Sequence, residues 1–424
     1  MIGENILTID DLEFQDKTVI LRVDLNSPID SDTNKIMDDS RIKEHAKTVR
    51  YLSSRGAKIV IMAHQGDPLF LDQFIPLKEH AQILSKHVGK KVEYIDDIFG
   101  PAAREAIKKL RKGNVLLLEN TRFFSEDTRL FEDTIVRTPE EQSKTLLVQK
   151  LYPLADIFVN DAFAAAHRSQ PSLVGFAEVL PSAAGLVLES ELRALMKIKD
   201  NPEKPCVFCL GGRKVSDRYV MIETVIKNNI ADKVLTSGII GLLMLKAAGY
   251  NVGSPTDSLI KKLGYEKYLT VSKKLLQEYG ERIEYPVDVV LDKSNGKEID
   301  LASLTKKDCD AQIVDIGRLT VEKYSRILIK AKTVFFSGPP GVFENKRFSI
   351  GTKDLLKAII DSGAFSVIGG GHSMLAIRKF RLLDKVSYVS TGGGALVRFL
   401  SGEELPIVAA LKKATERYLE NNMK

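Results

Sequence analysis

Short apolar runs alternate with helical patterns along almost the whole chain, and no other feature constrains its fold as strongly. The runs are continuously apolar and are followed by helical patterns, as is typical of parallel strands covered on both faces. The sequence therefore predicts an α/β fold with parallel sheets. The expected strands cover residues 18–23, 58–63, 114–119, 157–160, 206–210, 233–236, 287–291, 312–314, 333–336, 366–368 and 386–389, with helices at 39–56 and 77–88 and a polar loop at 125–142.

The alternation is interrupted once, near the middle of the chain. Residues 183–199 form one longer helical pattern, and a segment with two prolines ends it. A chain of 424 residues is long enough for two or three domains. We expect two α/β domains, residues 1–185 and 201–404, joined by a hinge helix at 186–200. An amphipathic helix at 405–424 is expected to pack back on the N-terminal domain.

Composition argues against several classes of protein. The net charge of +6 comes from 62 basic and 56 acidic residues, a mixed surface that favours no nucleic-acid partner but allows a basic cleft for a small anion. The N-terminus shows no signal peptide, and the longest apolar stretch, residues 239–245, is too short to span a membrane. Cys206 and Cys209 would point to opposite faces of a strand, so we expect buried structural thiols. We therefore expect a cytoplasmic protein, monomeric or homodimeric.

The residues that follow the expected strands are candidates for a binding site, because ligands of open parallel sheets bind beyond the carboxyl ends of the strands. In the first half these residues are arginine, histidine and short polar side chains. Arginine forks with histidine suit a compact phosphorylated anion. Three further histidines, His45, His80 and His87, fall on expected helices and are interpreted as surface residues. The strand-end residues are Asp24, Asn26, His64, Gln65, Gly66, Asp67, Arg122, Asp161 and Arg168.

In the second half, glycine turns follow the strands instead. One such turn is ordinary loop punctuation, but several along one sheet edge predict a nucleotide-phosphate site at helix N-termini. Neither the dinucleotide fingerprint nor the P-loop motif occurs, which argues against a dinucleotide dehydrogenase and a P-loop NTPase. The turns contain Gly211 and Gly212, Gly238, Gly317, Gly338, Gly369 to Gly371, and Gly392 to Gly394.

Lys214 and Arg218 follow the first of these turns. They lie four residues apart, which would place them on one face of the expected helix. Two fixed positive charges beside a helix N-terminus could hold a transferring phosphate group. A solvated basic helix start is the alternative, and these residues alone favour neither interpretation.

Motifs along the whole chain carry a resemblance to a known family. They are Arg22-Val-Asp-Leu-Asn26, Ser40-Arg41, Ala63-His-Gln-Gly66, Leu118-Glu-Asn-Thr-Arg-Phe123, Val159-Asn-Asp-Ala-Phe163, His167-Arg168, Gly211-Gly-Arg-Lys214, Gly338-Pro-Pro-Gly-Val-Phe-Glu344, Ile368-Gly-Gly-Gly371 and Ser390-Thr-Gly-Gly-Gly-Ala395. In this order they resemble phosphoglycerate kinases. The Gly-Gly-Gly-His form at 369–372 and Phe-Phe-Ser-Glu at 123–126 are similar to the archaeal branch.

The resemblance implies two Rossmann-like domains facing each other across a cleft, which a hinge would close. The N-terminal domain would bind 3-phosphoglycerate or 1,3-bisphosphoglycerate, and the C-terminal domain ADP or ATP with Mg²⁺. Transfer would be in line, with Arg41, Lys214 and Arg218 as catalytic charges. The implied substrate-binding residues are Asp24, Asn26, Arg41, His64, Gln65, Gly66, Asp67, Arg122 and Arg168; the implied nucleotide-binding residues are Gly212, Lys214, Gly238, Gly317, Pro339, Glu344, Gly369, Gly370, Gly371, His372 and Ser373.

Some positions depart from the commoner family pattern. His372 stands where an aspartate often linked to the metal is found, so the metal-contacting residues stay unassigned. Arg218 and Ser337 replace lysine and asparagine, and Arg318 stands where proline is frequent. Asp67 replaces an arginine; because a carboxylate would repel the substrate phosphate, we expect its side chain to turn away. Another kinase of phosphorylated carboxylic acids and a non-catalytic phosphometabolite-binding protein are the alternatives.

Overall fold

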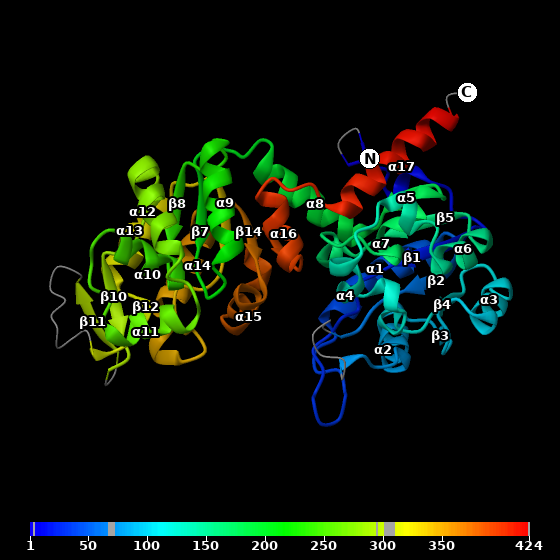
Figure 1. Cartoon of the computed structure of the whole chain (residues 1–424), viewed down its shortest axis with the longest axis horizontal. Coiled ribbons are helices and arrows are strands. Elements are labelled where there is room, and N and C mark those ends of the chain that lie inside the picture. The colour runs from blue at the N-terminus through cyan, green and yellow to red at the C-terminus, as the bar shows by residue number, and fades with distance from the viewer. Residues whose placement is uncertain (3–4, 67–72, 294–295, 301–309, 423–424) are drawn as a thin grey trace. The chain divides into compact units, whose positions relative to one another are not determined.

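The chain folds into two units, one of residues 1–193 and 404–424 and the other of residues 194–403 (Figure 1). The structure is a computed structural model and describes residues 1–2, 5–66, 73–293, 296–300 and 310–422. Each unit contains a six-stranded sheet in which all neighbouring strands are parallel. The predicted α/β class with two parallel-sheet domains is confirmed.

The first unit has the strand order β3-β4-β2-β1-β5-β6. The chain passes from β1 to β2 on one side of β1 and later from β4 to β5 on its other side, so the strand order reverses at β1. The crevice at the carboxyl end of β1 is therefore the expected ligand site of such a sheet. The strands are β1 Thr18–Arg22, β2 Lys58–Met62, β3 Val92–Tyr94, β4 Val115–Leu117, β5 Ile157–Asn160 and β6 Ser182–Ala184. The helices are α1 Ser40–Ser54, α2 Lys78–Val88, α3 Pro101–Lys108, α4 Arg129–Thr134, α5 Pro139–Gln142, α6 Leu146–Leu151, α7 Pro171–Val174, the first residues of α8 Leu186–Lys199, and α17 Pro406–Asn422.

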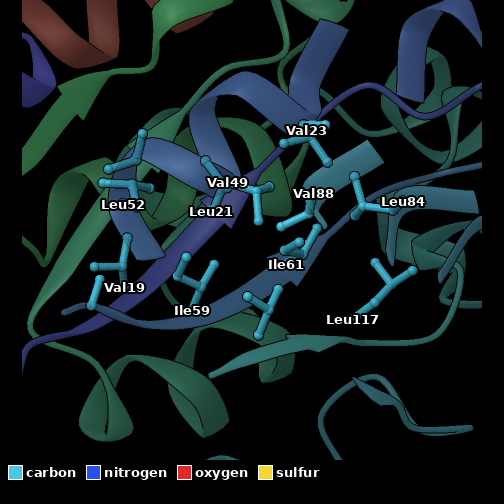
Figure 2. Close-up of a cluster of buried hydrophobic side chains, with 14 of the residues drawn as sticks. Val19, Leu21, Val23, Val49, Leu52, Ile59, Ile61, Leu84, Val88 and Leu117 are labelled. Carbon is cyan, nitrogen blue, oxygen red and sulfur yellow. The ribbon is translucent and has the colours of Figure 1, made fainter. Parts of the chain in front are cut away.

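Aliphatic side chains from β1 and β2 form the core of the first unit with those of α1 and α2. Figure 2 shows Val19 and Leu21 of β1 beside Ile59 and Ile61 of β2, with Val49 and other residues of the helices packed over them. The register pairs Val19 with Ile59 and Leu21 with Ile61, so alternate residues of both strands face the same helices. This packing fixes the strand ends that carry the polar residues.

The second unit has the strand order β15-β14-β13-β7-β8-β9, so its switch point lies between β13 and β7. A separate three-stranded antiparallel sheet has the order β11-β10-β12. The strands are β7 Cys206–Leu210, β8 Lys233–Thr236, β9 Ile283–Glu284, β10 Asp288–Leu291, β11 Lys297–Asp300, β12 Ile313–Ile316, β13 Thr333–Ser337, β14 Phe365–Gly369 and β15 Tyr388–Ser390. The helices are α9 Ser216–Lys227, α10 Gly238–Ala247, α11 Ser254–Lys262, α12 Tyr268–Tyr279, α13 Arg318–Leu328, α14 Ile350–Asp361, α15 Gly371–Lys379 and α16 Gly393–Leu400.

Several local predictions were wrong. The helix expected at 183–199 begins at Leu186, because residues 182–184 pair with β5 instead. The strands expected at 287–291 and 312–314 are β10 and β12, but these belong to the antiparallel sheet. The polar loop at 125–142 contains the short helices α4 and α5.

The prediction of a surface position was also wrong for two of the three helical histidines. His45 and His80 are 4% and 0% exposed rather than on the helix surface, since both accept or donate hydrogen bonds inside the first unit. Cys206 and Cys209 are buried as expected, and burial raises the pKa of Cys206 to about 12. These thiols are therefore not reactive at neutral pH.

Candidate active site

The carboxyl ends of β1 and β2 bring predicted substrate-binding side chains together. Asp24 and Asn26 follow β1, while His64 and Gly66 follow β2. Nη1 of Arg41, in the first turn of α1, donates a hydrogen bond to Oδ2 of Asp24 at 2.6 Å. The Gly66 amide donates to Oδ1 of Asn26 at 3.0 Å. Two strand ends and one helix thus form one polar surface.

His64 lies among several arginines of this surface. Burial lowers the pKa of His64 well below its usual value, and four cations lower it further: Arg122, Arg22, Arg41 and Arg168. Such effects require the guanidinium groups to lie near the imidazole. The ring is therefore neutral at physiological pH, within a positive potential that suits an anion.

Gln65 lies inside the loop that follows β2, with 1% of its surface exposed. Its Oε1 accepts from the Ser27 amide at 2.9 Å and lies 3.0 Å from Nε2 of His80. Its backbone carbonyl accepts from Nδ2 of Asn120 at 2.9 Å. The Gln65 side chain, which was predicted to bind substrate, thus forms hydrogen bonds that hold the loop in place. The position of Asp67 lies outside the described residues.

Two residues of the 125–142 segment, Asp127 and Glu132, form hydrogen bonds with Arg122 and with the backbone next to Arg168. Nη1 of Arg122 donates to the carbonyl oxygen of Asp127 at 3.0 Å, while its Nε is buried with no hydrogen-bond partner among the described residues. The backbone just after Arg168 is held by Glu132, whose Oε1 accepts from the Ser169 amide at 2.7 Å. No sequence motif had singled out Asp127 or Glu132.

A buried link that sequence reasoning missed joins Asp24 to α8. Nδ1 of His45 lies 2.8 Å from Oδ2 of Asp161, and its Nε2 accepts from the Asp24 amide at 3.3 Å. Oδ1 of Asp161 accepts from the amides of Val187 and Leu188, at 2.8 and 3.2 Å, in the first turn of α8. The carboxylate thereby satisfies two of the free amides at that helix start.

Three glycine turns interlock at the switch point of the second unit. Gly212, Gly238 and Gly338 have φ values of +73°, +54° and +89°. The Gly212 amide donates to the carbonyl oxygen of Pro339 at 2.9 Å. A Cβ atom on Gly238 would lie 2.5 Å from the Gly212 nitrogen, and one on Gly338 only 2.2 Å from the Gly211 oxygen. The close approach of β7, β8 and β13 therefore requires glycine here.

A pocket of about 330 Å³ opens beside these turns. Its walls include the apolar side chains of Ile239, Leu242 and Val289. Apolar walls with a few polar groups are typical of sites for small molecules such as a nucleotide base. Five residues predicted to bind nucleotide line it: Gly212, Gly238, Pro339, Glu344 and His372.

The other predicted nucleotide residues lie at nearby turns, with one exception. Gly369 to Gly371 join β14 to α15, and Oγ of Ser373 accepts from the Gly338 amide at 2.7 Å. Gly317 instead follows β12 of the antiparallel sheet, so the glycine turns do not all lie along one sheet edge. The helix start beside it is occupied by the carboxylate of Asp288, which accepts from the Thr320 amide at 2.7 Å.

The prediction that Lys214 and Arg218 share one helix face was wrong. The helix α9 begins at Ser216, so Lys214 lies before it and is exposed. Arg218 is buried, with Nη1 donating to the Lys214 carbonyl and Nη2 donating to Oγ of Ser337 at 3.3 Å. Burial lowers the pKa of Arg218 to about 10, so it stays cationic at neutral pH. Two of the departures from the family pattern, Arg218 and Ser337, thus contact each other.

Asp315 is a further residue of the pocket lining that was not predicted as a site residue. Its Oδ2 accepts from the Gly351 amide at 3.0 Å, and its Oδ1 accepts from its neighbour Ile316 at 2.9 Å. It packs so closely against Gly341 that a Cβ there would lie 2.4 Å from Oδ1. Burial raises the pKa of Asp315 to about 7.

We expect Asp315 to make the stability of the second unit fall as pH rises. Between the unfolded pKa, about 4, and the folded value of about 7, the folded protein holds a proton that the unfolded chain releases. Raising the pH through this window costs up to about 4 kcal/mol at 1.36 kcal/mol per pKa unit. Thermal unfolding of the wild type and Asp315→Asn from about pH 4 to about pH 8 measures it. The wild type should lose more stability than the variant; parallel pH profiles would contradict this assignment.

Among the described residues, no group of three or more histidine, cysteine, aspartate or glutamate side chains is arranged to hold a metal ion. Within the same residues, no helix has both the length and the apolar character needed to cross a bilayer.

Comparisons with known proteins agree over nearly the whole chain. The sequence model of the family "Phosphoglycerate kinase" matches residues 9–403. A phosphoglycerate kinase of Methanothermobacter thermautotrophicus is 48% identical over 96% of this chain and 97% of its own, and one of Pyrococcus furiosus is 45% identical over 96% and 98%. The crystal structure of phosphoglycerate kinase from Pyrococcus horikoshii matches with a TM-score of 0.88 at 44% identity, covering 97% of this chain and 99% of that one. The structure from Coxiella burnetii matches with a TM-score of 0.80 at 31% identity, covering 96% and 99%.

Proposed function

The chain belongs to the phosphoglycerate kinase family, and from that premise we propose how its own residues carry out the family's reaction. The enzyme transfers a phosphoryl group reversibly between 1,3-bisphosphoglycerate and ADP, giving 3-phosphoglycerate and ATP, in glycolysis and gluconeogenesis. The attacking carboxylate carries no proton, so no general base is needed. Catalysis then depends on positioning and on stabilising the charge of the transferring group.

The first unit binds 3-phosphoglycerate in this proposal. The 3-phosphate contacts His64, Arg122 and Arg168, and the observation that carries the assignment is the gathering of arginine charges around the neutral His64. At the other end of the substrate, Arg41 donates to the carboxylate and Asp24 accepts from the hydroxyl group.

The second unit binds ADP or ATP. The apolar pocket takes the base, Glu344 accepts from ribose hydroxyls, and the turns at Gly212, Gly338 and Gly369 to Gly371 offer backbone amides to the phosphates. Lys214 and Arg218 stabilise the transferring phosphoryl group, Arg218 with its direction fixed by Ser337.

Mg²⁺ accompanies the nucleotide in this proposal. The ion usually keeps several waters and is bound through substrate phosphates and few protein carboxylates, which agrees with the lack of a three-ligand group among the described residues. It would be held chiefly by the nucleotide phosphates near the start of α15, at Gly371 and His372, and would neutralise phosphate charge. A cytoplasmic location, a monomeric or homodimeric state and a hinge at 186–200 stay predictions.

A coupled assay tests the substrate assignment. We expect turnover of ATP with 3-phosphoglycerate and none above background with 2-phosphoglycerate, whose phosphate would be displaced from His64 and Arg122. Turnover with another phosphorylated acid alone would support a different kinase of this fold. Tight binding of 3-phosphoglycerate without turnover would support a non-catalytic binding protein.

A further inference from the structure

Arg22 is a cation that the proposed reaction does not use. It is the last residue of β1, it has no exposed surface, and its register partners are Met62 of β2 and Asn160 of β5. Burial lowers the pKa of Arg22 to about 10, so the guanidinium is charged at neutral pH. A buried charge of this kind is costly unless the protein satisfies it, so its contacts indicate its role.

The guanidinium donates in three directions within the first unit. Nε donates to Oγ of Ser172 at 2.9 Å, Nη1 to the carbonyl oxygen of Val23 at 2.5 Å, and Nη2 to Nδ1 of His64 at 2.8 Å. The Ser172 hydroxyl in turn donates to Oδ2 of Asp127 at 2.9 Å, and this buried carboxylate provides the compensating charge. Arg22 is thus engaged by protein groups rather than directed at a ligand.

The contact with His64 decides where the imidazole proton lies. A guanidinium has no acceptor, so Nδ1 of His64 must accept and cannot carry a proton. In a neutral ring the proton then lies on Nε2. The ring is neutral because burial and the charges of Arg22, Arg41, Arg122 and Arg168 lower its pKa.

We propose that Arg22 is a positioning residue, which holds His64 in the Nε2–H form so that the ring donates to the substrate phosphate. The proposal rests on the proposed function in one respect, the identity of that phosphate. Without Arg22 the Nδ1–H form becomes accessible, and its Nε2 lone pair would face the phosphate oxygens. Behind Arg22, the Ser172 hydroxyl satisfies Nε and the Asp127 carboxylate balances the charge, so both stabilise the buried cation.

The first test is nuclear magnetic resonance of the full chain with ¹⁵N-labelled histidine. The chain has six histidines, and the His64 signal is identified by its loss in His64→Gln. In the wild type we expect a protonated Nε2, an unprotonated Nδ1 and no titration near the ordinary histidine pKa. In Arg22→Met we expect mixed tautomers and a titration midpoint that rises toward that value. A protonated Nδ1 in the wild type, or an unchanged spectrum in Arg22→Met, would overturn the proposal.

Kinetics with 3-phosphoglycerate provide the second test. Loss of a directed hydrogen bond to a charged group predicts a KM about tenfold or more higher in Arg22→Met, with kcat and the KM for ATP within about threefold. In a His64→Ala background the same substitution should have little further effect. Additive effects on KM would overturn the route through His64. If 3-phosphoglycerate is not a substrate at all, the proposed function fails, while the tautomer result stands on the resonance data.

Three variants separate positioning from stability. Ser172→Ala keeps the contact between Arg22 and His64, so it should preserve the tautomer while lowering the melting temperature. Arg50→Met removes an exposed arginine of α1 and should change neither KM nor spectrum. Arg22→Lys keeps a buried cation and serves if Arg22→Met does not fold; because one ammonium cannot reproduce three fixed donors, it too should show mixed tautomers. A fully retained Nε2–H form and unchanged KM in Arg22→Lys would count against the proposal.

Discussion

Replacing Lys214 with methionine should lower kcat on the order of 100-fold or more, because a fixed cation at the transferring phosphoryl group stabilises the transition state more than the ground state. The side chain is exposed just before α9, beside the turn at Gly212 and the buried Arg218. Methionine keeps most of the aliphatic chain and removes the charge. Steady-state kinetics with saturating 3-phosphoglycerate and ATP give the measurement.

The control is Lys227→Met, which removes an exposed lysine at the far end of the same helix, where it pairs with Glu223. This variant should keep the wild-type kcat, since any loss there would reflect damage to α9. A Lys214→Met enzyme with unchanged kcat and only a raised KM for ATP would place Lys214 outside the transfer site. An equal loss of kcat in both variants would show that the charge of Lys214 has no specific role in phosphoryl transfer.

We expect Gly338→Ala to destabilise the second unit by more than about 4 kcal/mol, a size that mutational effects rarely reach. The added Cβ would lie 2.2 Å from the Gly211 oxygen and 2.9 Å from the Gly212 nitrogen, and both are backbone atoms that side-chain rotation cannot move aside. The φ value of +89° adds a cost of its own. Urea unfolding followed by circular dichroism measures the change, since the sequence contains no tryptophan.

Gly363→Ala is the matched control for backbone conformation. Gly363 has φ of +66°, but an added Cβ there would meet no atom within 4 Å. This variant should cost about 1–2 kcal/mol, the penalty of the left-handed conformation alone. If both variants lose a similar free energy of unfolding, the close packing of the glycine turns does not contribute to stability. If Gly338→Ala is insoluble while Gly363→Ala folds, the interlocking is supported.

The alternation of apolar runs predicted the sheets because the central strands, such as β1, β7 and β13, are buried on both faces and are therefore mostly apolar. The strand ends then followed, and with them Asp24, His64, Arg122 and the glycine turns. Boundaries set by tertiary pairing were not predictable: residues 183–184 are alanines that suit a helix, and only their pairing with β5 makes them a strand.

Partners that lie far apart in sequence explain the rest of what sequence reasoning missed. His45 has helical spacing, yet it is buried because Asp161, 116 residues away, supplies its hydrogen bond. In the sequence, Asp315 cannot be distinguished from other acidic residues that follow an expected strand. Its burial depends on close packing against Gly341 and Gly351, which are distant in sequence. The tautomer of His64 likewise follows from Arg22, which no local pattern connects to it.

The return of α17 to the first unit has a consequence for how the protein is made. Oγ1 of Thr415 accepts from the Leu7 amide at 3.0 Å, so this helix completes the structure that the first residues begin (Figure 1). The ribosome synthesises residues 404–424 after the whole second unit. The second unit, a continuous segment, can therefore fold during translation before the first unit is complete. Termination of synthesis before residue 404 would thus damage the unit that was translated first.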